Sequence, residues 1–111
     1  MFDNNYFMKN FTIRVRHTDE NTYEIYINSL TYIGEEKLLG VCIRGSIDTM
    51  VYNDFGVALI GNVNGGLFIF SVFDAINKKY VYDQEYMKNF YNEYLTFSKS
   101  KQSQILERKF R

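Results

Sequence analysis

The residues best suited to acid–base chemistry or metal binding lie in one short polar stretch, His17-Thr18-Asp19-Glu20. It places the only histidine of the chain beside two carboxylates, and such groups can hold a divalent ion or move protons. Sites of that kind draw ligands from several elements, and the sequence has no second histidine. We therefore predict an ordinary polar turn here, with no catalytic residue and no metal ligand. A small hydrolase or nuclease that uses His17 is the least favoured hypothesis.

The single cysteine, Cys42, excludes an internal disulfide and a thiolate metal site within one chain. It lies in the apolar run Leu39 to Ile43, which predicts a core side chain rather than a nucleophile. The glycines between Gly61 and Gly66 lack the Lys and Ser/Thr of a phosphate-binding loop, so no cofactor is predicted.

Length and composition favour one domain over residues 1–111. The chain has 111 residues and 46% apolar composition, which is enough for one core. Its net charge of +0 argues against a surface built wholly to bind phosphates or a membrane. No run approaches the ~18 apolar residues of a membrane span, and residues 1–10 lack the features of a signal peptide. These features predict a cytoplasmic protein.

The residue usage indicates an AT-rich genome. The chain has 10 Tyr, 10 Phe, 10 Ile and 11 Asn against 2 Ala and no Pro. AT-rich codons encode the frequent types, so codon bias explains the many tyrosines better than a binding role does.

Strict alternation predicts strands at the start of the chain. Apolar and polar residues alternate over 11–16 and again over 22–28, which is the pattern of two half-buried strands in an antiparallel hairpin. In that hairpin Arg14 and Arg16 are predicted to face Glu24.

Three further strands are expected between residues 38 and 73. The run 38–44 is apolar on both sides, with Leu39, Val41 and Ile43 on one face, and predicts a central strand. Residues 45–56 leave a short strand undecided. The runs 57–63 and 66–73, joined by Asn64-Gly65, predict a hairpin with a type I′ turn. Phe68 and Phe70 are predicted to be core residues.

The last third changes from strand to helical periodicity. Residues 83–97 predict an amphipathic helix with Asp83 as N-cap, and residues 98–111 a basic C-terminal tail or short helix. The predicted fold is thus α+β, with an antiparallel β-meander of five or six strands over residues 11–73 and the helix packed on one face.

The apolar half of this helix is wider than packing on a sheet requires, so part of it is predicted to contact a partner. We hypothesise a non-enzymatic inhibitor, such as an immunity protein, an antitoxin-like inhibitor or a phage anti-defence inhibitor. It would occlude a macromolecular partner such as a nuclease, toxin or defence enzyme, and a second copy of the chain is an alternative partner. The predicted partner contacts are Tyr86, Met87, Tyr91, Tyr94 and Leu95.

The charge distribution carries an alternative, a small nucleic-acid-binding protein. Residues 98–111 hold five basic residues and one Glu, a net charge of +4, so residues 1–97 carry −4. A basic tail can bind phosphates, whereas an acidic body suits the basic cleft of a nucleic-acid-handling enzyme. The predicted contacts with nucleic acid or an acidic partner are Arg14, Arg16, Lys99, Lys101, Arg108 and Lys109.

Overall fold

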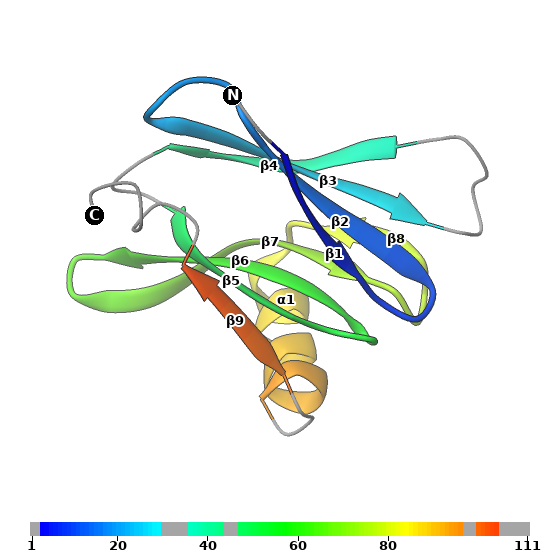
Figure 1. Cartoon of the computed structure of the whole chain (residues 1–111). Coiled ribbons are helices and arrows are strands. Elements are labelled where there is room, and N and C mark those ends of the chain that lie inside the picture. The colour runs from blue at the N-terminus through cyan, green and yellow to red at the C-terminus, as the bar shows by residue number, and fades with distance from the viewer. Residues whose placement is uncertain (1–2, 30–35, 44–46, 97–99, 105–111) are drawn as a thin grey trace.

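Two antiparallel sheets stack on one another, and a helix covers the far side of the second (Figure 1). The computed structural model describes residues 3–29, 36–43, 47–96 and 100–104. The first sheet contains, in spatial order, β1 (Asp3–Phe7), β2 (Phe11–His17), β3 (Thr22–Ser29) and β4 (Glu36–Ile43). The second contains, in spatial order, β8 (Lys79–Val81), β7 (Gly66–Asp74), β6 (Gly56–Val63), β5 (Ile47–Asn53) and β9 (Lys101–Gln104). The helix consists of α1 (Gln84–Phe90) and a π-helix, η1 (Tyr91–Leu95).

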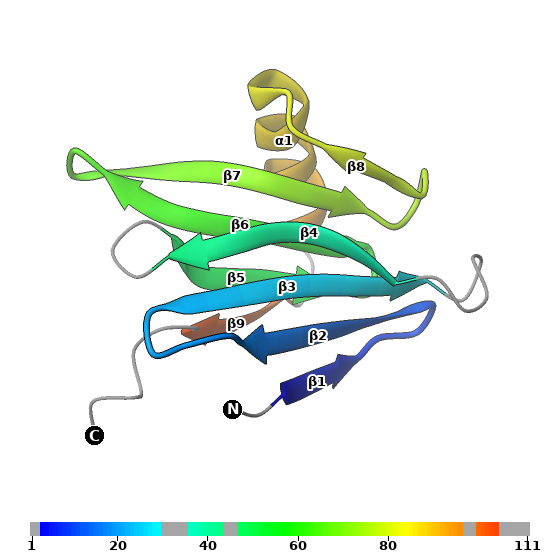
Figure 2. The same cartoon turned by 90° about the horizontal axis from the view of Figure 1, so that it is seen from above.

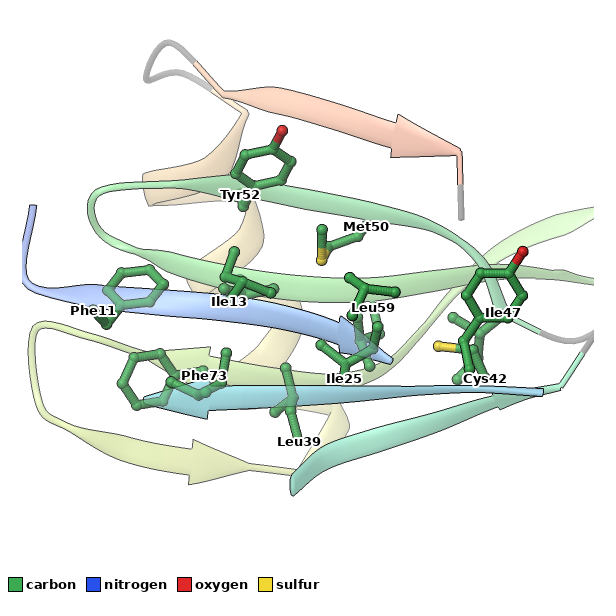
Figure 3. Packing of buried hydrophobic residues seen from close by; sticks show 14 residues of the cluster. Phe11, Ile13, Ile25, Leu39, Cys42, Ile47, Met50, Tyr52, Leu59 and Phe73 are labelled. Carbon is green, nitrogen blue, oxygen red and sulfur yellow. The ribbon is translucent and has the colours of Figure 1, made fainter. Parts of the chain in front are cut away.

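The main core lies between the two sheets (Figure 3). The alternation of β2 and β3 places one side chain in two on the inner face, where it is removed from water. Phe11 and Phe73 meet across the sheets with ring centroids 5.2 Å apart. The other buried members are Ile13, Val15, Tyr23, Ile25, Ile27, Leu39, Cys42, Ile47, Met50, Tyr52, Val57 and Leu59.

A second core joins the helix to the face of the second sheet that points away from the first sheet. The strands β5, β6 and β7 are therefore buried on both faces, which explains the unbroken apolar run Val57–Ile60. The buried residues are Val51, Ala58, Ile60, Ile69, Val72, Val81, Met87, Phe90 and Leu95.

The helix begins and ends with side-chain hydrogen bonds. The Asp83 carboxylate accepts from the Tyr86 backbone N–H at 2.9 Å, so the predicted N-cap is confirmed. At the other end, the buried Asn53 amide donates to the Tyr94 carbonyl oxygen at 2.8 Å and ties the helix to β5. Among the described residues no helix is long and apolar enough to cross a membrane.

The prediction of an α+β fold with antiparallel strands and a helix on one sheet face is confirmed, but the number of strands is wrong. The described residues form nine strands in two sheets instead of one meander of five or six. Three strands were missed: β1, in the predicted N-terminal segment, β8, and β9, in the predicted basic tail. Each has five residues or fewer and pairs with one longer strand, which leaves too short a pattern to recognise in the sequence.

The hairpin of β6 and β7 is confirmed together with its turn. Asn64 and Gly65 have φ values of 51° and 81°, as a type I′ turn requires. The prediction that Phe68 is a core residue is wrong, since it is 36% exposed and belongs to neither buried cluster. Phe70 is half-buried against the main core.

The prediction for β4 is wrong in both its position and its faces. β4 is an edge strand, not a central one. Its pairing with β3 shifts register so that Tyr26 faces Leu38 and Ile25 faces Gly40, which leaves Leu39 as an extra residue. This β-bulge turns Leu39 and Cys42 toward the core and Leu38, Val41 and Ile43 toward solvent.

Candidate functional site

A network of charged and aromatic side chains lies across the solvent-exposed face of the first sheet, which we call the outer face. Arg14 donates two hydrogen bonds to the Glu36 carboxylate, at 2.7 and 2.8 Å, and its guanidinium carbon lies 4.7 Å from the centre of the Tyr26 ring. The Tyr26 hydroxyl donates to Glu24 at 3.0 Å, and Glu24 lies 3.7 Å from Arg16. The predicted pairing of Arg16 with Glu24 is confirmed by the register, whereas Arg14 lies opposite Tyr26.

This network holds the outer face in one arrangement and removes its net charge. A bidentate Arg–Glu pair fixes both side chains, and the Tyr26 ring covers the guanidinium. Two arginines and two glutamates sum to zero over the network. The outer face therefore gives no general attraction for phosphates.

Three aliphatic side chains stand beside the network on the edge strand, and we call them the β4 stripe: Leu38, Val41 and Ile43. They are 41%, 40% and 55% exposed. Val41 lies opposite Glu24 and Leu38 opposite Tyr26, so the stripe and the charged network form one continuous surface. A rigid, neutral surface with exposed aliphatic groups is suited to contact with another protein.

The helix presents much less to solvent than the sequence predicted. Met87 and Leu95 are fully buried in the second core, so they are not available to a partner in the folded protein. Tyr94 packs against Phe90, with ring centroids 5.0 Å apart. Tyr86 and Tyr91 are half-buried. The width of the apolar half is explained by contacts of the helix with β5, β6 and β7.

The predicted basic contacts do not come together in the described part of the chain. Arg14 and Arg16 lie on the outer face, in contact with carboxylates. Lys101 is exposed in β9, which belongs to the second sheet. Lys99, Arg108 and Lys109 lie outside the described residues.

His17 ends β2 and its ring contacts that of Tyr23 at a tilt of 47°, with ring centroids 4.0 Å apart. Over residues 3–29, 36–43, 47–96 and 100–104, no group of three His, Cys, Asp or Glu side chains is placed to hold a metal ion.

The Cys42 thiol is expected to be chemically inert in the folded protein. Cys42 is fully buried, and burial raises the pKa of its thiol from 9.0 to about 12, so little reactive thiolate exists at neutral pH. Ellman's reagent should label Cys42 in the native protein only as fast as the fold opens to expose the thiol. In denaturant it should label Cys42 at once. Rapid labelling in native buffer would contradict the buried position.

Tyr86 should make stability depend on alkaline pH. Its hydroxyl donates to Asp74 at 2.5 Å, and this hydrogen bond is the main cause that raises the pKa of Tyr86 above its ordinary value of 10.0, with burial second. The neutral hydroxyl therefore stabilises the fold fully below the ordinary pKa, and this contribution is lost as pH rises through the raised one. Denaturant unfolding between neutral pH and about pH 11 should show a steeper loss for the wild type than for Tyr86→Phe. Parallel curves would contradict this role.

Sequence reasoning missed the β4 stripe because it assumed unbroken alternation along β4. One signal was present: Gly40 interrupts the apolar run, and a glycine inside a strand often marks a bulge. An alanine Cβ at Gly40 would lie 2.9 Å from Leu59 and 3.3 Å from the Ser71 hydroxyl, so Gly40 faces inward like Leu39.

The comparisons with protein-family models, with curated proteins and with solved structures give no match for this chain. The function proposed below is therefore argued from the structure of the chain.

Proposed function

We propose that this chain is a non-enzymatic inhibitor that binds a macromolecular partner, a protein, through the outer face and the β4 stripe. The observation that carries the proposal is the β4 stripe, since three neighbouring aliphatic side chains remain in water on a strand whose inner side chains are buried. Burying such groups against a partner is favourable, at about 25 cal/mol per Å² of apolar surface.

The charged network beside the stripe supports a protein partner. Its arginines and glutamates are already held in position, so little side-chain freedom is lost when a partner covers them. The negative charge of residues 1–97 supports a partner with a basic cleft, such as a nuclease or another nucleic-acid-handling enzyme.

A capture experiment tests the proposal and separates it from nucleic-acid binding. The tagged chain is incubated with lysate of its source organism, with and without nuclease. The variants are Val41→Lys, which places a charge in the stripe, and Leu67→Lys, which places one at an exposed position of the second sheet. We expect wild type and Leu67→Lys to retain one stoichiometric protein after nuclease treatment, and Val41→Lys to lose it.

Equal capture by Val41→Lys would contradict the role of the stripe. A signal that disappears with nuclease would favour the nucleic-acid alternative. Thermal unfolding of all three proteins controls for folding, and both exposed positions should tolerate lysine.

A further inference from the structure

Four aromatic side chains, three from the second sheet and one directly after β8, lie beside the edge of β4, and we call them the aromatic ledge: Phe68, Phe70, Tyr80 and Tyr82. Phe68 and Phe70 contact each other edge to face, with ring centroids 4.9 Å apart. Tyr80 lies opposite Phe73 in the register of β7 and β8, and so faces the same side as the main core. Phe68 and Tyr82 remain 36% and 58% exposed.

The ledge runs along β4. Near the start of β4, Lys37 Nζ lies 5.2 Å from the centre of the Tyr80 ring. At the bulge, the Tyr82 hydroxyl donates to the Leu39 carbonyl oxygen at 3.5 Å, and Gly40 faces Ser71 of β7. β4 and β7 run in opposite directions, and β7 and β8 extend beyond β4 on the side away from β3 (Figure 2). The end of β4 therefore lies nearest the start of β7, where Phe68 and Phe70 are.

Between Lys37 and Cys42, no described strand pairs with this side of the β4 backbone. Within the described part of the chain β4 pairs only with β3, and the Tyr82 hydrogen bond is long enough to be exchanged readily. The other three edges are protected in the usual ways: β8 is three residues long, and β1 and β9 carry mainly polar residues. Only β4 is a long edge strand with exposed aliphatic side chains among these four.

The charge at one end of the ledge is positive. Lys37 is exposed there, and none of the described carboxylates forms an ion pair with it. Glu36, its neighbour, is held by Arg14 on the outer face. A ligand that lies along β4 would therefore meet a basic group at the end near Tyr80.

We propose that the open edge of β4 binds an extended segment of the partner protein as an added strand. The segment has apolar side chains at alternate positions, which cover the aromatic ledge, and an acidic residue that pairs with Lys37. The added strand would give the first sheet five strands, as the second already has. Main-chain hydrogen bonds would supply affinity, and the ledge and Lys37 would supply specificity. This proposal rests on the proposed protein-binding function and specifies how the partner is held.

A displayed library of random nine-residue peptides, selected on the immobilised full chain, tests the added strand. We expect enriched peptides to alternate apolar and polar residues and to carry Asp or Glu near one end. Their affinity for the Phe68→Ser variant should be lower by about tenfold or more, because an anchoring aromatic contact is lost. It should remain unchanged on Leu67→Ser, because Leu67 is the adjacent residue and points to the other face of β7.

Charge reversal provides a second variant that does not touch the packing. Selection on Lys37→Glu should replace the acidic preference by a basic one, whereas the exposed helix variant Lys88→Glu should leave it acidic. No enrichment, or enriched peptides that bind Phe68→Ser and Lys37→Glu as they bind wild type, would overturn the added strand.

The two proposals can fail separately. In one case Val41→Lys fails to capture the partner, but no selected peptide depends on Lys37. The protein-binding function is then supported, and the added strand is overturned. Peptides that depend on Phe68 and Lys37, with normal capture by Val41→Lys, support the added strand and remove the β4 stripe from the partner contact.

Discussion

Replacing Gly56 with alanine is expected to destabilise the fold by about 3 kcal/mol, because the added methyl group has no space. Gly56 begins β6, where it pairs with Asp74 of β7 and lies close to Phe90 of the helix. An alanine Cβ would overlap the Phe73 carbonyl oxygen and lie 2.9 Å from the Phe90 ring. The carbonyl belongs to a paired strand and cannot turn aside, so strand and helix must separate. Thermal unfolding should show a fall in Tm of about 10 °C or more.

Gly65→Ala is the matched control, because Gly65 is special for a different reason. A Cβ at Gly65 would meet nothing within 4 Å, but the residue has a φ of 81°. We expect a cost of about 1 kcal/mol from backbone strain alone. If Gly56→Ala cost no more than Gly65→Ala, the close approach of Phe73 and Phe90 to Gly56 would be refuted.

The strands that the sequence predicted correctly are those that carry their own signal. β2 and β3 alternate without interruption, and β6 and β7 flank a dipeptide whose φ values match the turn. In these segments local preference and burial agree, so periodicity is sufficient. β5, which was left undecided, is buried on both faces and so shows no simple alternation.

The strands that were missed depend on distant partners. β9 pairs with β5, about 50 residues earlier in the chain, through the register Val51 to Gln102. Its sequence, KQSQ, has neither alternation nor β-branched residues. Such pairing depends on which strand edge the rest of the fold leaves available. Residues 101–104 alone do not indicate that edge.

The burial of Met87 and Leu95 was missed for a related reason. Periodicity gives the width of an apolar helix face but not what covers it, and the second sheet covers Met87 and Leu95. The π-helix contributes, because its hydrogen bonds join residues five apart, as from Thr96 N–H to the Tyr91 carbonyl oxygen. This places Leu95 on the buried side together with Phe90. The β4 stripe was hidden by one bulge residue, which reverses the faces of all residues after it.

Asp74→Ala is the second substitution with a large expected effect, about 3 kcal/mol of lost stability. Asp74 ends β7 and is fully buried. Its carboxylate accepts from the backbone N–H groups of Ile76 and Asn77, both at 3.0 Å, from the Asn77 amide at 2.9 Å and from the Tyr86 hydroxyl at 2.5 Å. Alanine removes every acceptor at once, so the turn before β8 and the first turn of α1 lose their common anchor. Denaturant unfolding measures the loss.

Asp54→Ala is the matched control, since Asp54 is also a turn aspartate but is exposed and accepts one hydrogen bond, from Lys9 N–H at 2.9 Å. We expect it to cost less than about 1 kcal/mol. Tyr86→Phe removes only one of the four donors to Asp74 and should fall between the two. Tyr80 and Tyr82 lie beside the edge of β4 and follow the Asp74 turn in the chain. Asp74→Ala should therefore also lower the affinity of the chain for the peptides selected on wild type. A loss of stability no greater than that of Asp54→Ala would show that the buried carboxylate does not anchor the turn.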